Sequence, residues 1–291
     1  MGDCFSEYSC FLKEEPFDLA ANSSIGCGGK AKIAFFPRNV EEFVALLRKL
    51  EEDRLQYRVV GNMTNVLPSD EGINGVLIST KKCLECNLGE QNFVSAGIAS
   101  GRLLQMCRYA GKSGVEFLYG IPCTFGGALF MNAGVSGTYV GDVVESVLVY
   151  RDKKCVWLSV KDCQYAYKHS VFMKDNDVIL GARLCLTDAT VQEIDKRLRF
   201  FNERRAHLPQ GKSMGCVFKN PKGEYAGRLL ETAGVCGLKK GDAYVSEKHA
   251  NFIINGGKAK SADVQELIGE MKRAVLKQHG VLLEEEIRYL T

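Results

Sequence analysis

Apolar residues recur every three or four positions in four stretches of the chain, a spacing that is typical of amphipathic helices. These stretches cover residues 40–50, 100–112, 190–201 and 261–275. The third begins with Thr190 and Glu193, whose spacing forms a capping box at a helix start. A further short helix is expected over residues 225–233, because Gly234 provides a C-terminal stop.

Short apolar runs bounded by glycine, proline or polar turns predict strands. They occur at residues 33–37, 57–60, 75–78, 93–96, 146–150, 155–158, 178–186 and 286–290. The first part of the chain therefore reads as a βαβ unit followed by a strand-rich part. The pattern changes near residue 187, and we expect an α+β unit after it.

The composition is that of an ordinary globular protein and argues against several functional classes. The 291 residues include 38 basic and 35 acidic side chains, so the formal net charge is +3, with 46% hydrophobic and 25% charged residues. Such a weak charge does not favour a nucleic-acid binder or a membrane-surface binder. No apolar run approaches the about 18 residues of a membrane span, so none is expected.

Twelve cysteines are the unusual feature of the composition. A chain of this length has enough core without disulfides. The only CxxC motif, Cys83 to Cys86, lacks the second ligand pair that a structural zinc site needs. We therefore expect no metal, and mostly buried thiols in a cytoplasmic protein.

Three glycine-rich stretches are candidates for binding phosphate groups. Residues 26–31 match a loose dinucleotide pattern, but no strand precedes them and a strand, not a helix, is expected to follow. Residues 61–65 and 120–127 are better candidates, since glycine lets backbone N–H groups approach a pyrophosphate closely. From glycine content alone, these two loops are equally compatible with a dinucleotide cradle and with tight turns.

Eight motifs in order along the chain carry a resemblance to a known family. They are Asn22-Ser23-Ser24 with Gly28-Gly29, Gly61-Asn62-x-Thr64-Asn65, Gly120-Ile121-Pro122 with Gly126-Gly127, Met131 to Gly134, Tyr167-x-His169-Ser170, Gly215 to Pro221, Ser246-Glu247-Lys248-His249-Ala250-x-Phe252 to Asn255, and Leu283-Glu284-x-Glu286. Over roughly residues 20–290 the chain resembles the UDP-N-acetylenolpyruvoylglucosamine reductases, in the subtype that lacks an extra substrate-covering loop.

The resemblance implies an α+β fold, with a two-part FAD-binding domain of the vanillyl-alcohol-oxidase type followed by an α+β C-terminal substrate domain. The expected bounds are a leader at 1–20, the FAD-binding domain at 21–187 with lobes of about 21–80 and 81–187, and the substrate domain at 188–291. The resemblance also implies the reaction. NADPH reduces FAD, and UDP-N-acetylglucosamine enolpyruvate is then reduced to UDP-N-acetylmuramate for peptidoglycan synthesis.

Three residues match the catalytic positions of the family. Cys216 stands where the family has a serine that protonates the substrate carbon, and a thiol with a reference pKa of about 8.5 is protonated at pH 7 and can do the same. Lys168 replaces an arginine that faces the flavin and the substrate carboxylate, which keeps the charge but loses the two-pronged donor. Glu286 matches a carboxylate that helps to polarise the enolpyruvyl group, although Glu285 replaces the usual proline before it.

Other residues of the motifs match binding positions. The expected FAD-binding residues are Gly61, Asn62, Thr64, Asn65, Gly120, Ile121, Pro122, Thr124, Gly126, Gly127, Asn132 and Gly134. The expected substrate-binding residues are Lys219, Asn220 and His249. A further family lysine falls on Cys236, and Lys239 or Lys240 is a candidate replacement for its charge near the UDP diphosphate.

Two alternatives remain open at this point. One is an FAD-dependent oxidase of the same fold that acts on another small molecule. The other is a catalytically degenerate binding protein, for which the departures at Lys168, Cys216 and Cys236 are the evidence. We expect a cytoplasmic monomer whose partners are the sugar nucleotide and NADPH, with no nucleic acid and no membrane.

Overall fold

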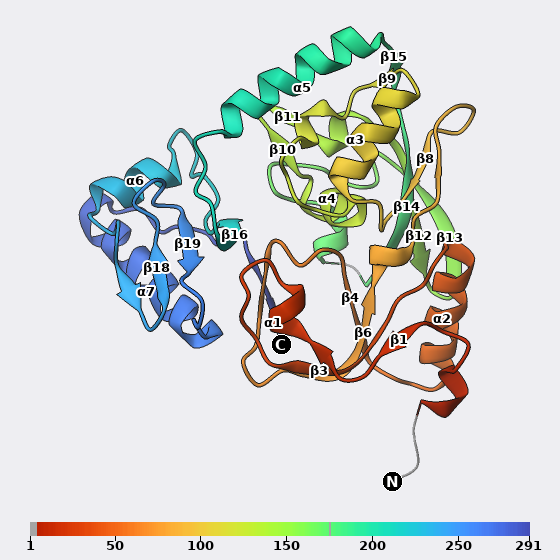
Figure 1. Ribbon diagram of the computed structural model, residues 1–291, viewed down its shortest axis with the longest axis horizontal. Coiled ribbons are helices and arrows are strands. Elements are labelled where there is room, and N and C mark those ends of the chain that lie inside the picture. Colours follow the sequence, from red (N-terminus) through yellow and green to blue (C-terminus); the bar gives the residue numbers. More distant parts are fainter. Residues whose placement is uncertain (1–4, 175) are drawn as a thin grey trace. The chain divides into compact units, whose positions relative to one another are not determined.

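The computed structural model describes residues 5–174 and 176–291, and the chain divides into two compact units (Figure 1). Unit 1 comprises the residues up to Glu15, residues 33–62 and residues 75–206. Unit 2 comprises residues 16–32, 63–74 and 207–291. Each unit is therefore built from three separate stretches of sequence.

A mixed sheet with one covering helix forms the first part of unit 1. Its strands follow the order β1 (Lys13–Glu14), β3 (Lys30–Phe35), β6 (Ile73–Ser79) and β4 (Tyr57–Val60), and β4 and β6 are parallel. Helix α2 (Val40–Glu52) buries Phe43 and Leu47 in a cluster with Phe35. Phe5 and Tyr8 join this cluster, so the described part of the expected leader contributes to the core, while residues 1–4 lie outside the described residues.

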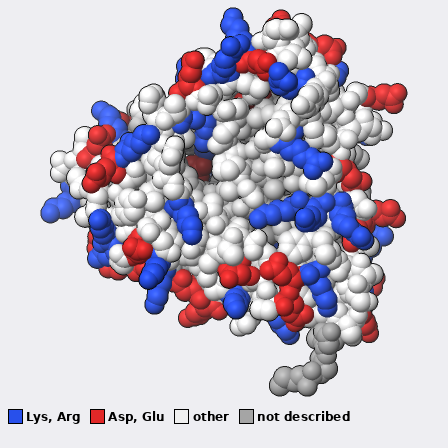
Figure 2. All heavy atoms as spheres, in the orientation of Figure 1, with Lys and Arg blue, Asp and Glu red and all other residues white. Residues whose placement is uncertain are grey.

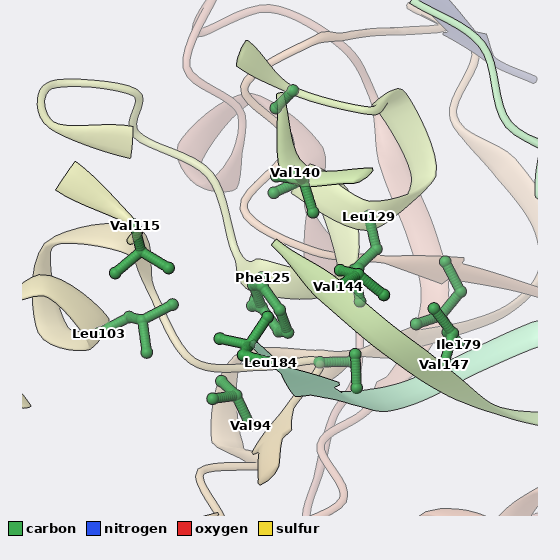
Figure 3. Close-up of a cluster of buried hydrophobic side chains, with 14 of the residues drawn as sticks. Val94, Leu103, Val115, Phe125, Leu129, Val140, Val144, Val147, Ile179 and Leu184 are labelled. Carbon is green, nitrogen blue, oxygen red and sulfur yellow. The ribbon is translucent and has the colours of Figure 1, made fainter. Parts of the chain in front are cut away.

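An antiparallel sheet and three helices form the rest of unit 1. The strand order is β13 (Lys154–Ser159), β12 (Val144–Arg151), β14 (Val178–Leu184), β8 (Phe93–Ser95) and β7 (Cys86–Asn87), and the helices are α3 (Ser100–Tyr109), α4 (Phe125–Met131) and α5 (Val191–Arg205). Figure 3 shows Leu103 of α3 and Phe125 of α4 pointing into one cluster with Val94, Val147 and Leu184 of the sheet. This core fixes the start of α4, which overlaps the end of the glycine-rich stretch at residues 120–127.

Helix α5 belongs to unit 1 because it packs against the other elements of that unit. Its Asp195 pairs with Arg108 of α3 at 2.6 Å, and Leu198 and Phe201 pack against the cluster of Figure 3. The expected capping box at its start, Thr190 with Glu193, is present. The compact unit therefore ends at residue 206, whereas the sequence pattern changes at 187. The boundary at 187 between two functional domains stays a prediction.

A four-stranded antiparallel sheet with two helices forms most of unit 2. The strand order is β16 (Lys212–Cys216), β19 (Phe252–Asn255), β18 (Ala243–Val245) and β17 (Lys239–Lys240), and the helices are α6 (Ala226–Thr232) and α7 (Ser261–His279). Strand β20 (Arg288–Leu290) pairs in parallel with β5 (Val66–Pro68). Asp70 accepts hydrogen bonds from the first backbone N–H groups of α7, at Ser261 (2.8 Å) and Ala262 (3.0 Å).

The remaining elements are short. They are η1 (Ser6–Tyr8), η2 (Thr80–Lys82), η3 (Glu116–Leu118), η4 (Val140–Asp142), η5 (Val171–Met173), α1 (Leu19–Asn22), β2 (Phe17–Asp18), and the pairs β9 (Lys112–Ser113) with β15 (Thr187–Asp188) and β10 (Gly134–Val135) with β11 (Thr138–Tyr139). None of the helices in the described part of the chain is both long and apolar enough to cross a membrane. Basic and acidic side chains are interspersed on the face shown in Figure 2.

Candidate active site

The two glycine-rich loops of unit 1 lie against each other. Gly61 follows β4, and a Cβ atom at this position would overlap the hydroxyl oxygen of Thr124. The Asn62 side chain donates a hydrogen bond to the carbonyl oxygen of Pro122 at 2.7 Å. The Thr124 hydroxyl also accepts a hydrogen bond from the backbone N–H of Gly127 at 3.4 Å. The two loops therefore form one surface in the folded chain.

One glycine of this surface leaves room at the backbone, which is what a dinucleotide cradle requires. Gly127 has an ordinary negative φ, and the only described atom near a Cβ atom there would be Thr124 Oγ1, at 3.5 Å. The packing of the described chain does not itself require glycine at this position, so the missing side chain leaves room for a ligand at the backbone. Gly120 and Ile121 lie in the same loop, and Gly120 adopts a φ of +70°. Gly126 packs against Ala96 beside them.

Asn132, expected to bind FAD, uses its side chain within the protein. It ends α4 in the left-handed conformation, accepts a hydrogen bond from Gly141 N at 2.9 Å and donates one to Ala166 O at 2.8 Å. Ala166 and His169 exchange both backbone hydrogen bonds, so the tip of this turn is Tyr167 and Lys168. Asn132 therefore holds the turn that carries the predicted catalytic lysine.

The Lys168 turn lies beside a cavity of unit 1. Lys168 adopts a φ of +51°, which places a non-glycine residue in the left-handed region. Tyr139, Tyr165 and Tyr167 line the cavity together with Asn132, and its volume is about 480 Å³. Asn132 thus connects the turn to the cavity wall. Gly134 lies in the small hairpin of β10 and β11, where a side chain would overlap β11.

In unit 2, the peptide that follows Cys216 connects three of the predicted residues. Cys216 ends β16 opposite Phe252. The next residue, Val217, donates its N–H to Asn251 O at 2.9 Å and accepts the N–H of Glu286 at 2.7 Å. Asn251 lies two residues after His249. The backbone segments that carry Cys216, His249 and Glu286 therefore meet at one residue.

Each residue of the acidic run at 284–286 has a different partner, through the side chains of Glu284 and Glu285 and through the backbone of Glu286. Glu284 pairs with Lys219 at 2.5 Å, and Glu285 pairs with Lys272 at 2.9 Å. The Asn65 side chain donates a hydrogen bond to Glu286 O at 3.0 Å, so this expected FAD-binding residue also holds the backbone of the predicted catalytic glutamate. Thr64, next to Asn65, is half-buried in the same unit.

His249 is a half-buried side chain with a defined orientation. Its Nδ1 accepts a hydrogen bond from Asn251 N at 3.2 Å, and its ring packs on Phe252 with the centroids 5.0 Å apart. Because Nδ1 accepts, the neutral ring carries its proton on Nε2 and offers a donor there. Burial lowers the pKa of His249. Asn220 is exposed, and its side chain accepts a hydrogen bond from Ala226 N at 3.0 Å.

The structure distinguishes the two candidate replacements for the lysine that is missing at Cys236. The Lys240 ammonium group lies 2.9 Å from both Glu266 and Glu270. Lys239 instead lines a cavity of about 440 Å³ in unit 2, together with Lys248. A lysine engaged by two carboxylates is a poor partner for an anionic ligand, so Lys239 is the better candidate.

Asn251 is the residue that the sequence analysis missed. It is the unspecified position inside the motif from Ser246 to Asn255, and it is buried with 2% exposure. A buried asparagine amide needs hydrogen-bond partners, so its place between two apolar residues was the available signal. The described cysteines are free thiols, and no group of His, Cys, Asp or Glu among the described residues could hold a metal ion.

Family models match both parts of the chain. A model described as the FAD binding domain matches residues 31–156. A model described as the C-terminal domain of UDP-N-acetylenolpyruvoylglucosamine reductase matches residues 206–290. The second match covers Cys216, His249 and Glu286, which are the residues that the Val217 peptide connects.

Two curated proteins that are similar to nearly the whole chain carry the same name. The UDP-N-acetylenolpyruvoylglucosamine reductase of Caldicellulosiruptor saccharolyticus is 36% identical over 96% of this chain and 92% of the relative. That of Carboxydothermus hydrogenoformans is 38% identical over 96% and 93%. The crystal structure of UDP-N-acetylenolpyruvylglucosamine reductase from Thermus caldophilus is similar with a TM-score of 0.81 and 32% identity, covering 97% of this chain and 99% of that one.

Proposed function

Because this chain belongs to the UDP-N-acetylenolpyruvoylglucosamine reductase family, we propose that it reduces UDP-N-acetylglucosamine enolpyruvate to UDP-N-acetylmuramate, with NADPH as reductant and FAD as cofactor. The observation that carries the proposal is the similarity over 96% of the chain to reductases that are themselves covered to 92% or more. Neither the oxidase nor the degenerate binding protein finds support among these relatives.

Unit 1 supplies the residues that would hold FAD. The loops at residues 61–62 and 120–127 contact each other, and Gly127 leaves room at the backbone. We assign the pyrophosphate to backbone N–H groups of these loops, where glycine permits close approach. When bound, FAD supplies the hydride acceptor and donor for the two half-reactions.

Cys216 is the proposed proton donor. Reduction of an enol ether beside a carboxylate builds negative charge on the carbon between them, which requires a proton from the protein. The Cys216 thiol is half-buried at the end of β16, and Val217 after it is held by two backbone hydrogen bonds. This anchorage keeps the thiol at a fixed place in unit 2 while it gives up its proton.

Cations and donors would hold the negative charges of the substrate. We propose that Lys168 faces the carboxylate and that Glu286 helps to polarise the enolpyruvyl group. Lys219, Asn220 and the Nε2–H of His249 would bind the sugar nucleotide, with Lys239 in place of the lysine absent at Cys236. We also propose that the protein acts as a monomer in the cytoplasm.

The test is to purify the protein, record its flavin absorbance, and mix it with NADPH and the enolpyruvyl sugar nucleotide. We expect bound yellow flavin and NADPH oxidation that depends on the sugar nucleotide. Either the absence of flavin or NADPH oxidation at the same rate without the sugar nucleotide would contradict the proposal. Oxygen-dependent turnover of another small molecule would instead support the oxidase.

A further inference from the structure

Asn251 binds the segment after Cys216 through both its backbone and its side chain. Its side-chain oxygen accepts the Phe218 N–H at 2.9 Å, and its side-chain amide donates to Phe218 O at 2.8 Å. Its backbone oxygen accepts the Val217 N–H at 2.9 Å. Three bonds from one residue therefore fix the two residues that follow Cys216.

The same residue fixes the His249 ring. The Asn251 backbone N–H donates to His249 Nδ1, which keeps the ring proton on Nε2. The other side of the ring is closed by α6, because a Cβ atom at Gly227 would lie only 2.8 Å from His249 Cε1. The ring therefore has little room to turn over, and its donor points in one direction.

We propose that Asn251 is a positioning residue, whose amide and peptide together hold the Cys216 segment and the His249 tautomer in one fixed relation. This inference rests on the proposed function, in which Cys216 donates a proton and His249 binds the substrate. Asn251 is buried at 2% exposure and acts through these two residues. A buried amide with both ends paired resists displacement, because each unpaired polar atom would carry a desolvation cost.

Asn255 provides a matched control. It is the last residue of β19, the strand that begins directly after Asn251. It is also buried, at 5% exposure, and its amide makes four hydrogen bonds, whereas the Asn251 amide makes two. Its partners are the backbone groups of Ile25, Gly26, Gly257 and Ala259. Asn255→Ala therefore removes at least as many amide hydrogen bonds in unit 2 as Asn251→Ala, and none of them involves Phe218 or His249.

The experiment compares Asn251→Ala with Asn255→Ala in two measurements. The first is the kcat/KM for the enolpyruvyl sugar nucleotide together with the rate of flavin reduction by NADPH. We expect Asn251→Ala to lower kcat/KM by between about tenfold and a hundredfold, since a misplaced reacting group costs that much. Flavin reduction should be unchanged, and Asn255→Ala should leave both rates near those of the wild type.

The second measurement needs no substrate. The ¹⁵N spectra of the four histidines report their tautomers, and His249→Gln assigns the His249 signals. Alanine keeps the backbone N–H at position 251, so the tautomer reports whether the two side-chain bonds to Phe218 hold that N–H against His249 Nδ1. We expect the Nε2–H tautomer in the wild type and in Asn255→Ala, and a mixture of tautomers in Asn251→Ala because the peptide at position 251 is no longer held in place. If Asn251→Ala does not fold, Asn251→Asp keeps the size and the acceptor oxygen but loses the donor to Phe218 O, and the same differences should appear.

The outcomes separate the two proposals. Equal tautomers and equal kcat/KM values in the Asn251 and Asn255 variants would overturn the positioning role. A wild-type protein that does not turn over the sugar nucleotide would overturn the proposed function, while the tautomer spectra would still decide whether Asn251 positions His249.

Discussion

The two units hold their predicted reacting groups in related but unequal ways. In unit 1, the amide of Asn132 joins two separate segments, at Gly141 and Ala166, and the second carries the Lys168 turn. In unit 2, both ends of the Asn251 amide bind one residue, Phe218. Both asparagines are buried, with exposures of 4% and 2%.

The difference lies in what each asparagine adds to the secondary structure. In the Lys168 turn, Ala166 and His169 bond to each other through their backbones. Two side chains join this segment to α4 and its C-cap: Asn132 donates to Ala166 O, and Ser170 donates to Phe130 O at 2.6 Å. The Cys216 segment already pairs with β19 and with Glu286, and Asn251 reinforces it. The comparison teaches that the Lys168 turn is joined to its surroundings mainly through side chains, those of Asn132 and Ser170, whereas the Cys216 segment combines backbone pairing with the Asn251 amide.

The largest expected effect is at the thiol. Cys216→Ala should lower turnover of the sugar nucleotide by about 10²- to 10⁴-fold, since it removes the general acid. Flavin reduction by NADPH should continue, measured by stopped-flow absorbance. Cys216→Ser, which restores the hydroxyl of the family, should retain turnover. Normal turnover by Cys216→Ala would remove this residue from the mechanism.

The next largest effect concerns the bond between Asn132 and the Lys168 turn in unit 1. Asn132→Ala should raise the KM for the sugar nucleotide about tenfold or more, because Ala166 at the base of the Lys168 turn loses its bond to Asn132. The flavin content of the purified protein should be unchanged. Loss of flavin with an unchanged KM would show instead that Asn132 acts through FAD, as its motif predicts.

A third prediction concerns the contact between the two glycine-rich loops. Gly61→Ala should lower the free energy of unfolding by about 1–3 kcal/mol, because its Cβ atom would overlap Thr124. Gly101→Ala in α3 is the matched control, since the described residues leave its Cβ position open, and it should raise the free energy of unfolding by about 0.5–1 kcal/mol. Thermal melts of both variants check the opposite signs.

The smallest effect is the pH dependence of stability from His249. Its pKa is lowered by burial, so the folded state resists protonation of the ring while the unfolded state takes up a proton below pH about 6.5. The free energy of unfolding should therefore fall as the pH drops from about 7.5 to 5. His249→Gln should show a shallower fall in urea titrations, and an equal slope would contradict the assignment.

The long helices could be predicted from the sequence because their apolar faces repeat over several turns. The predictions for α2, α5 and α7 are confirmed, including the capping box of α5. The sheet of unit 2 could not be predicted, since β16, β18 and β19 have only three to five residues each, and β16 includes Gly215. Such short strands have too few positions to show alternation.

For the candidate site too, the sequence indicates some features and not others. The motifs give the positions of Cys216, Lys168 and Glu286, whose roles stay predictions. The contacts that hold them connect residues far apart in sequence, such as Asn251 with Phe218 and Asn65 with Glu286. No spacing rule indicates such pairs, and Asn251 appeared in its motif as an unspecified position.

The division of the chain into interleaved stretches sets the order in which a growing chain can complete each unit. Every residue of unit 1 has been synthesised once residue 206 is added. Residues 16–32 and 63–74 must then wait, because β5 pairs with β20 and Asp70 caps α7, and both partners are synthesised only after residue 260. A ribosome stalled before residue 261 would therefore carry every residue of unit 1 and an incomplete unit 2, as in proteins whose domains fold one after another during synthesis.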